Sequence, residues 1–198
     1  MDRNDWNQRY RSTDLLWSAG PNQFVEPELA DLPPGRALDL AAGEGRNAIW
    51  LASRGWKVTA IDFADVAVDR GRAWAERSGV QVDWIVADLT QHVPEPRAYD
   101  LVLLAYLQLP WPAMQQLLGR AADAVAPGGT LFLIGHDTRN LAEGYGGPKS
   151  TEFLYSPESV AAALRGLSVV RAETVERPVE TDQGRRVALD CLVRATRA

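Results

Sequence analysis

The sequence predicts an α/β fold, built on a doubly wound, mostly parallel seven-stranded sheet that ends in an antiparallel hairpin. Three observations support this prediction. Apolar runs of strand length alternate with helical segments from about residue 37 to residue 135, which is typical of βαβ units. The run at 99–105 is almost continuously apolar, as expected for a strand buried on both faces. Two later strand-like runs are separated by a short polar loop at 180–184, which predicts a hairpin.

Length and composition limit the possible functions. The 198 residues predict a single domain, 1–198, that is large enough for a substantial core. The net charge of −5 argues against a nucleic-acid partner, because such proteins normally present a basic face. The single cysteine, Cys191, excludes an intrachain disulfide and most cysteine-ligated metals. A polar start and the lack of a long apolar run predict a cytoplasmic protein without a membrane segment. We expect either a monomer or a weak homodimer.

Residues 1–32 form an aromatic segment ahead of the first strand. Trp6 and Tyr10 are four residues apart, which places them on one face of a helix, and Trp17 follows. Two interpretations remain open. The segment is either a cap that closes over a bound ligand, with these three aromatic residues contacting substrate, or a flank packed permanently against the domain.

A strand expected at 37–40 leads into a turn that contains Gly43 and Gly45, and a helix begins at Arg46. Glycine permits both the tight turn and the close approach of a ligand. A strand, a glycine turn and a helix together surround a ligand with backbone N–H groups and a helix N-terminus. This stretch is therefore the candidate ligand site around which the chain is organised.

Two acidic residues separate the ligands that this turn could hold. The spacing of Gly43, Gly45 and Ala48 matches the dinucleotide fingerprint, so an NAD(P)-dependent oxidoreductase is one hypothesis. However, Asp39 at the end of the strand and Glu44 inside the turn would repel a pyrophosphate. The residues favour a positively charged cofactor instead.

The remaining elements follow from apolar runs ended by glycine or proline. Gly55 and Gly79 end the first two helices, and Pro127 with two following glycines leads into another strand. Further strands are expected at 57–62, 81–86, 99–105, 130–135, 167–177 and 186–195. Further helices are expected at 63–78, at 110–126 and at 157–165.

The glycine stretch resembles motif I of the class I S-adenosylmethionine-dependent methyltransferases, with Asp39, Gly43 and Gly45 in the expected places. Ala41 stands where a glycine is usual; we expect it to keep a negative φ, which makes the departure mild. The aromatic leader is similar to that of small methyltransferases related to the tellurite-resistance and thiopurine enzymes. The resemblance implies a Rossmann-like methyltransferase fold, S-adenosyl-L-methionine as the cofactor and a small-molecule acceptor.

The resemblance also implies which residues hold the cofactor. Asp62, at the end of the second strand, would accept both ribose hydroxyls, and Asp88, after the third, would accept from the adenine amino group. Arg46 and Asn47 either brace the turn or border the substrate. The expected cofactor residues are Asp39, Ala41, Gly43, Gly45, Arg46, Asn47, Asp62, Phe63, Asp88, Leu89 and Ala105.

The methyl acceptor is less defined. The sequence after Ala105 lacks the Asp/Asn-Pro-Pro-Tyr motif of the DNA-adenine and glutamine methyltransferases and offers no acid for magnesium, so we expect no metal. His136 follows a strand at the substrate end of the sheet and is a candidate general base, with Asp137 as the residue that could orient its ring. Alternatively, His136 bonds to backbone and Asp137 caps the turn.

An acceptor that is already ionised would need no base, and a module that binds the cofactor without chemistry is a third hypothesis. The expected catalytic residues are His136 and Tyr106. The expected substrate contacts are Trp6, Tyr10, Trp17, Tyr106, His136, Arg139 and Tyr145.

Overall fold

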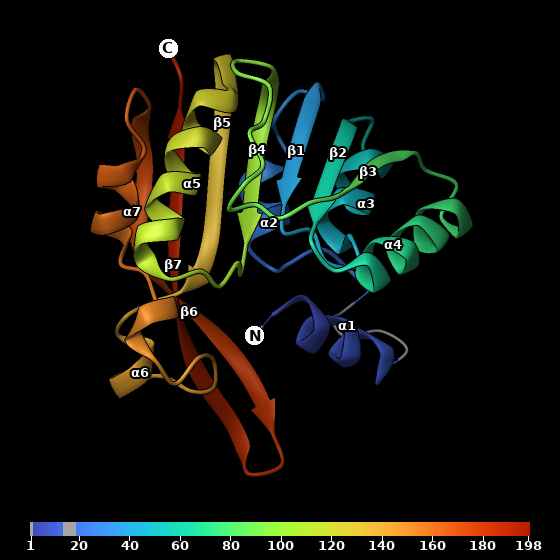
Figure 1. The fold of residues 1–198 in the computed structure, drawn as a ribbon. Coiled ribbons are helices and arrows are strands. Elements are labelled where there is room, and N and C mark those ends of the chain that lie inside the picture. Colours follow the sequence, from blue (N-terminus) through green and yellow to red (C-terminus); the bar gives the residue numbers. More distant parts are fainter. Residues whose placement is uncertain (1, 14–18) are drawn as a thin grey trace. The chain divides into compact units, whose positions relative to one another are not determined.

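The computed structural model describes residues 2–13 and 19–198, so Trp17 lies outside the described residues. The strands form one mixed sheet (Figure 1). Its order is β3 (Val82–Val86), β2 (Lys57–Asp62), β1 (Arg36–Leu40), β4 (Tyr99–Ala105), β5 (Val125–His136), β7 (Gly184–Thr196) and β6 (Ser168–Thr181). β1 pairs in parallel with β2 and β4, and β2 pairs in parallel with β3, whereas β7 is antiparallel to β5 and β6. The predicted fold class is confirmed.

The chain divides into two compact units. The first consists of Met1–Val93 and Tyr99–Ala105, and the second of Pro94–Ala98 and Tyr106–Ala198. None of the helices that the structure describes is both long enough and apolar enough to cross a bilayer.

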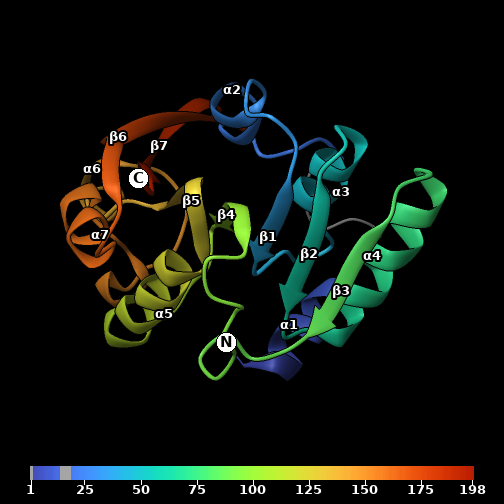
Figure 2. The same ribbon diagram turned by 90° about the horizontal axis from the view of Figure 1, so that it is seen from above.

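The first unit holds the four parallel strands. β1 and β4 are buried along most of their length, with Leu38, Leu40 and Leu103 inaccessible to solvent, as continuous apolar strands require. The helices α3 (Arg46–Ser53) and α4 (Asp65–Arg77) pack against β1, β2 and β3 (Figure 2). Ahead of β1, the leader contributes α1 (Arg3–Arg11) and α2 (Val25–Leu29).

Trp84 of β3 occupies the space beside two glycines. A Cβ atom added at Gly45, in the turn before α3, would overlap Cη2 of the Trp84 indole, and so would a Cβ added at Gly71 in α4. The two glycines therefore let the indole fit between the glycine turn and α4. Gly45 is required for this packing as well as for its left-handed backbone, with φ of 81°.

The second unit is built on the antiparallel strands β5, β7 and β6. Its helices are α5 (Trp111–Ala124), α6 (Asn140–Glu143), a 3₁₀ turn η1 (Thr151–Phe153) and α7 (Pro157–Ala163). α7 begins with a capping box in which the Ser156 and Ser159 side chains each accept the backbone N–H of the other residue. α5 packs on β5, and α7 packs on β6 and β7.

Two predicted boundaries in this unit were wrong. β5 begins at Val125 rather than at residue 130, because Gly128 and Gly129 continue the ladder through backbone hydrogen bonds with Arg197. The hairpin loop is also shorter than 180–184. Strand pairing runs on to Thr181 opposite Gly184, and the Thr181 hydroxyl closes the two-residue turn by donating to the Gly184 carbonyl.

Candidate active site

The turn after β1 is tied to the end of β2. The Gly43 N–H donates to Oδ2 of Asp62 at 2.8 Å. Three residues of the turn have left-handed backbone: Ala41 with φ of 63°, Gly43 with 57° and Gly45 with 81°. The expected negative φ of Ala41 was wrong, because the chain must reverse there, where related motifs have a glycine. A Cβ atom is unfavourable in this region of backbone space.

Replacing Ala41 with glycine should therefore stabilise the protein. Relief of the left-handed backbone is worth about 1–2 kcal/mol, and the greater freedom of glycine in the unfolded chain takes back about 0.5–1 kcal/mol. The expected net gain is up to about 1.5 kcal/mol in the free energy of unfolding, measured by urea denaturation. A loss of stability in Ala41→Gly would contradict this account of the turn.

Asp39 is the most unusual side chain of the first unit. It is 0% exposed, and neither carboxylate oxygen accepts a hydrogen bond of normal geometry from the described residues. Burial raises its pKa to about 7, and the nearby charge of Asp62 acts in the same direction, whereas Arg46 and the Ala48 backbone N–H oppose the rise. A buried carboxylate without partners is costly, so a positively charged ligand at this place would relieve the cost.

Asp62 is held by backbone at the end of β2. Besides the bond from Gly43, Oδ1 accepts the Ala64 N–H at 2.9 Å, and the side chain is 6% exposed. Burial raises its pKa, while these backbone bonds lower it. A carboxylate offers about four lone-pair positions, so Asp62 keeps some capacity to accept from a ribose diol. The residues present fit the cofactor that the sequence predicts.

Glu44 contributes less to ligand selection than its position in the turn suggests. It is 3% exposed, and its carboxylate pairs with the Arg70 guanidinium at 3.2 Å. The pairing offsets the repulsion that Glu44 would exert on a pyrophosphate. The electrostatic argument against NAD therefore rests on Asp39.

The other expected cofactor residues have mixed surroundings. Asp88 is exposed, and its Oδ1 accepts both the backbone N–H and the hydroxyl of Thr90 at 2.8 Å, so that it caps the turn after β3. Leu89 is buried, and Ala105 ends β4 half-buried. Asn47 braces the leader, because its Oδ1 accepts the Asn22 N–H at 2.8 Å. Their contacts with a cofactor stay predictions.

The leader packs next to the end of β2. Trp6 and Tyr10 lie on one face of α1 with ring centroids 5.8 Å apart, as predicted. Tyr10 is buried in a cluster with Ala64 and Ala67 of the first unit, and Trp6 and Phe63 pack against that cluster. Phe63, the expected neighbour of the adenine, thus packs against the same cluster as Trp6 of α1.

Two polar side chains, Asn7 and Arg70, fix α1 and the residues after it. The Asn7 amide donates to the Asp65 carboxylate and accepts the Val66 N–H, which joins α1 to the start of α4. The Arg70 guanidinium donates both to the Thr13 carbonyl and to Glu44. One arginine thus links the described leader to the glycine turn.

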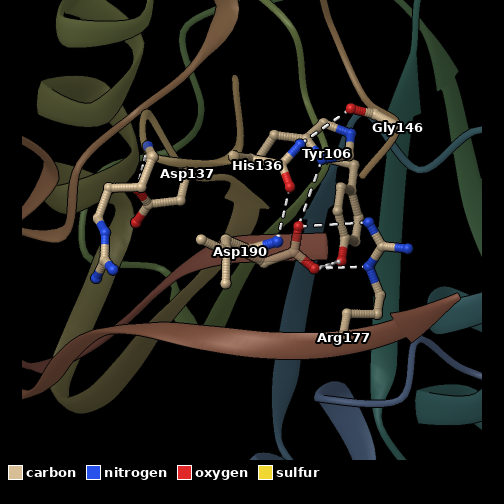
Figure 3. Close-up of polar contacts among 9 residues, drawn as sticks. Tyr106, His136, Asp137, Gly146, Arg177 and Asp190 are labelled. Atoms are coloured by element: carbon tan, nitrogen blue, oxygen red, sulfur yellow. Dashed lines mark hydrogen bonds and ion pairs between the residues drawn. The ribbon is translucent and has the colours of Figure 1, made fainter. Parts of the chain in front are cut away.

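In the second unit, three side chains converge on one buried carboxylate (Figure 3). Asp190 is 0% exposed and accepts from the Tyr106 hydroxyl at 2.6 Å and from Nε of Arg177 at 2.6 Å. Nδ1 of His136 lies 3.4 Å from Asp190 Oδ1. Burial alone would raise the pKa of Asp190, but the contacts from His136, Arg177 and Tyr106 outweigh burial and hold the pKa below its ordinary value.

The expectation that Asp137 orients the His136 ring was wrong. Asp137 accepts from the Arg139 N–H and from the Thr174 hydroxyl, both at 2.8 Å. Consecutive residues of an extended chain point to opposite sides, so the side chain after His136 faces away from the ring. Asp190 takes that place because it lies directly opposite His136 in the register of β5 and β7.

A glycine-rich loop lies over His136. The Asn140 amide donates to the Gly146 carbonyl at 3.0 Å and accepts the Leu189 N–H at 2.7 Å, which pins the loop to β7. Arg139 and Tyr145, expected to contact substrate, are exposed, and Arg139 pairs with Glu143. Their substrate contacts stay predictions.

Tyr106 has a strained backbone at the point where β4 ends. Its φ is 55°, which is unusual for a large side chain. The following loop is held by the Tyr155 hydroxyl, which donates to the Leu109 carbonyl at 2.7 Å and accepts the Leu109 N–H at 2.8 Å. Strain of this kind is often found at functional positions.

Sequence reasoning missed Asp190 and Arg177. The available signal was the acid itself, which interrupts an apolar strand, since charged residues are rarely buried without a partner.

Within the described residues, no group of three or more His, Cys, Asp or Glu side chains is placed to hold a metal ion.

Comparison with known proteins gives consistent matches. Residues 37–129 match the family model described as a methyltransferase domain. The tRNA 5-carboxymethoxyuridine methyltransferase of Escherichia coli strain K12 is 30% identical over 135 residues, which are 64% of this chain and 49% of that protein. The ubiquinone biosynthesis O-methyltransferase of Xanthomonas campestris pv. campestris strain B100 is 35% identical over 103 residues, 52% of this chain and 43% of that protein. The chain spans about half the length of these relatives.

Solved structures share the fold over the whole chain. The N-methyltransferase NodS of Bradyrhizobium japonicum WM9, solved with S-adenosyl-L-homocysteine, has a TM-score of 0.74 at 18% identity and covers 100% of this chain and 99% of that one. TehB of Haemophilus influenzae has a TM-score of 0.77 at 14% identity, with coverages of 99% and 67%. Residues 37–129 are therefore similar to a methyltransferase domain, and the chain shares the fold of these solved structures.

Proposed function

We propose that this chain is an S-adenosylmethionine-dependent methyltransferase that acts on a small-molecule acceptor. The observation that carries the proposal is Asp39, a fully buried carboxylate beside a glycine turn whose two oxygens accept no hydrogen bond of normal geometry from the described residues. It suits the cationic methionyl part of the cofactor, and Asp62 suits the ribose. When bound, the cofactor supplies a sulfonium-activated methyl group, so the protein mainly has to align the acceptor and exclude water.

The acceptor class rests on the names of the relatives and on the net charge of the chain. The ubiquinone relative is named for a small-molecule pathway, whereas the Escherichia coli relative is named for a tRNA. The net charge of −5 favours the small molecule, because tRNA binding depends on basic residues. We place Tyr106 and His136 at the acceptor, with Trp6 and Tyr10 of the leader as further contacts.

We further propose a cytoplasmic protein, a monomer or weak homodimer, in which residues 1–32 are a cap within a single methyltransferase domain. One cysteine in 198 residues is usual for a reducing compartment. The described part of the leader packs against the first unit through Tyr10 and Asn7, next to the end of β2.

A thermal-shift experiment tests the cofactor. S-adenosylhomocysteine at a hundred times its dissociation constant should add about 2.7 kcal/mol to the stability, whereas NAD and NADP should not change the melting temperature. Stabilisation by NAD and none by S-adenosylhomocysteine would overturn the proposal in favour of an oxidoreductase. Binding without any methyl transfer from tritiated S-adenosylmethionine, across a panel of small acceptors and tRNA, would favour a binding module.

Cofactor affinity should depend on pH through Asp39. Because burial raises the pKa of Asp39 to about 7, the free protein holds a proton there at lower pH, and a cationic ligand must displace it. Affinity for S-adenosylmethionine should therefore fall by up to about tenfold for each pH unit below 7. Isothermal titration calorimetry between about pH 5.5 and pH 8, in buffers of different ionisation enthalpy, measures both the affinity and the proton released.

The control is Asp39→Asn, which has the same shape but no titrating group. It should bind S-adenosylmethionine more weakly than the natural protein, with little change across the same pH range. An unchanged affinity of the natural protein across this range would show that Asp39 does not face the cationic part of the cofactor.

A further inference from the structure

The imidazole of His136 is held on three sides within the second unit (Figure 3). Nδ1 faces Asp190, 3.4 Å from its Oδ1. The Tyr106 ring lies edge-on to the imidazole, with centroids 5.0 Å apart and an interplanar angle of 62°. On another side, Gly147 lies so close that an added Cβ would be 3.1 Å from Nδ1. The ring therefore has little freedom to turn.

The two ring nitrogens have different surroundings. Nδ1 is completely buried, and the only carboxylate paired with it among the described residues is that of Asp190. Nε2 makes no hydrogen bond to any residue that the structure describes. The His136 side chain is 12% exposed. An ionised carboxylate only accepts hydrogen bonds, so the proton of the neutral ring belongs on Nδ1. The lone pair is then on Nε2.

The charges around Asp190 keep it an acceptor. Arg177 donates to it from Nε at 2.6 Å and lies over the Tyr106 ring, with the guanidinium carbon 5.5 Å from the ring centroid. The Tyr106 hydroxyl donates to the same oxygen of Asp190, so Tyr106 is not placed to act as a base. The 3.4 Å separation of His136 from Asp190 is long for a hydrogen bond, which is common for catalytic pairs without substrate.

We propose that Asp190 is a positioning residue that keeps Nδ1 of His136 protonated, so that Nε2 removes a proton from the methyl acceptor. This inference rests on the proposed methyltransferase function. As the acceptor atom forms its bond to the methyl carbon, its proton passes to Nε2, and the electron pair of the broken carbon–sulfur bond goes to sulfur, which leaves a neutral thioether. The reacting group is then one that carries a proton at neutral pH, such as a hydroxyl, and not a thiolate or selenide.

Nitrogen-15 NMR tests the proposal without an acceptor. The chain has two histidines, so the His92→Gln variant assigns both sets of imidazole signals. At a pH where the rings are neutral, long-range proton–nitrogen spectra should show His136 with the proton on Nδ1. In Asp190→Asn the predominance of this tautomer should be lost, as happens when the aspartate of a catalytic triad is replaced by asparagine.

Each outcome decides the matter. A natural protein with the proton of His136 on Nε2 overturns the proposal, even if Asp190→Asn fails to fold. Tyr106→Phe removes one hydrogen-bond donor to Asp190 but leaves the carboxylate, so His136 should keep its proton on Nδ1 in this variant. The proposal is also overturned if Tyr106→Phe loses this tautomer and Asp190→Asn does not. Binding of S-adenosylhomocysteine tests the proposed methyltransferase function separately, because this binding reports on the cofactor site and not on the tautomer of the His136 ring.

Discussion

Replacing Arg177 with methionine should destabilise the protein by about 3 kcal/mol or more at neutral pH. The variant leaves Asp190, which is 0% exposed, without its strongest partner, and breaking a buried ion pair on one side typically costs about 3–5 kcal/mol. The Tyr106 hydroxyl still donates to Asp190, so the lower end of that range is expected. Urea denaturation followed by circular dichroism measures the loss.

The loss should depend on pH in a defined direction. The pKa of Asp190 is lower in the folded protein than its ordinary value of 3.8, so its pairing contributes stability above that value, and this contribution is lost as the pH falls through the folded pKa. The difference between the natural protein and Arg177→Met should therefore be largest near neutrality and shrink below about pH 4. A difference that grows on acidification would contradict an ionised Asp190.

Two further variants isolate the buried charge. Arg177→Met combined with Asp190→Asn removes that charge and should recover more than half of the lost stability. Arg171 is on the same strand and pairs with Glu173, but the two side chains are 39% and 53% exposed. Arg171→Met should thus cost less than about 0.5 kcal/mol. Equal losses in Arg171→Met and Arg177→Met would point to a general effect on β6.

The sequence predicts the first unit better than the second, and the reason is physical. β4 has the predicted bounds because it is a compact apolar run in a parallel sheet, and β2 has them because Gly55 before it and Asp62 at its end delimit it. Asp39 and Asp62 are brought to the same turn because adjacent parallel strands end at the same edge. These features depend on local pattern and on a topology that the alternation of strands and helices already defines.

The polar cluster of the second unit depends on pairing that local sequence does not specify. His136 meets Asp190 only because β5 and β7 pair in one register, and a shift of one residue would turn Asp190 to the other face. Arg177 reaches the same carboxylate from β6, through a second register that contains an irregularity between Val169 and Arg171. The left-handed backbone of Ala41 was missed for another reason: the glycine usual at that place in motif I indicated it, but the alanine was expected to allow a negative φ.

Gly45→Ala should cause a comparably large loss, about 1–4.5 kcal/mol in the free energy of unfolding, after about 0.5–1 kcal/mol is offset because alanine loses less freedom on folding than glycine. Two effects add. Gly45 has φ of 81°, where a Cβ atom costs about 1–2 kcal/mol. The same Cβ would overlap the Trp84 indole, and overpacking of this kind costs about 1–3 kcal/mol. Chemical denaturation of the purified variant gives the total.

Three control variants separate the two effects. Gly79 has φ of 69° and no atom within 4 Å of an added Cβ, so Gly79→Ala reports the backbone effect alone. Gly71→Ala reports the overlap with Trp84 at a helical position, reduced by about 1 kcal/mol because alanine favours helix. Trp84→Phe removes the outer indole ring, so in that background the cost of Gly45→Ala should fall to that of Gly79→Ala. An unchanged cost in the Trp84→Phe background would mean that Gly45 is required by the backbone of the turn and not by the indole beside it.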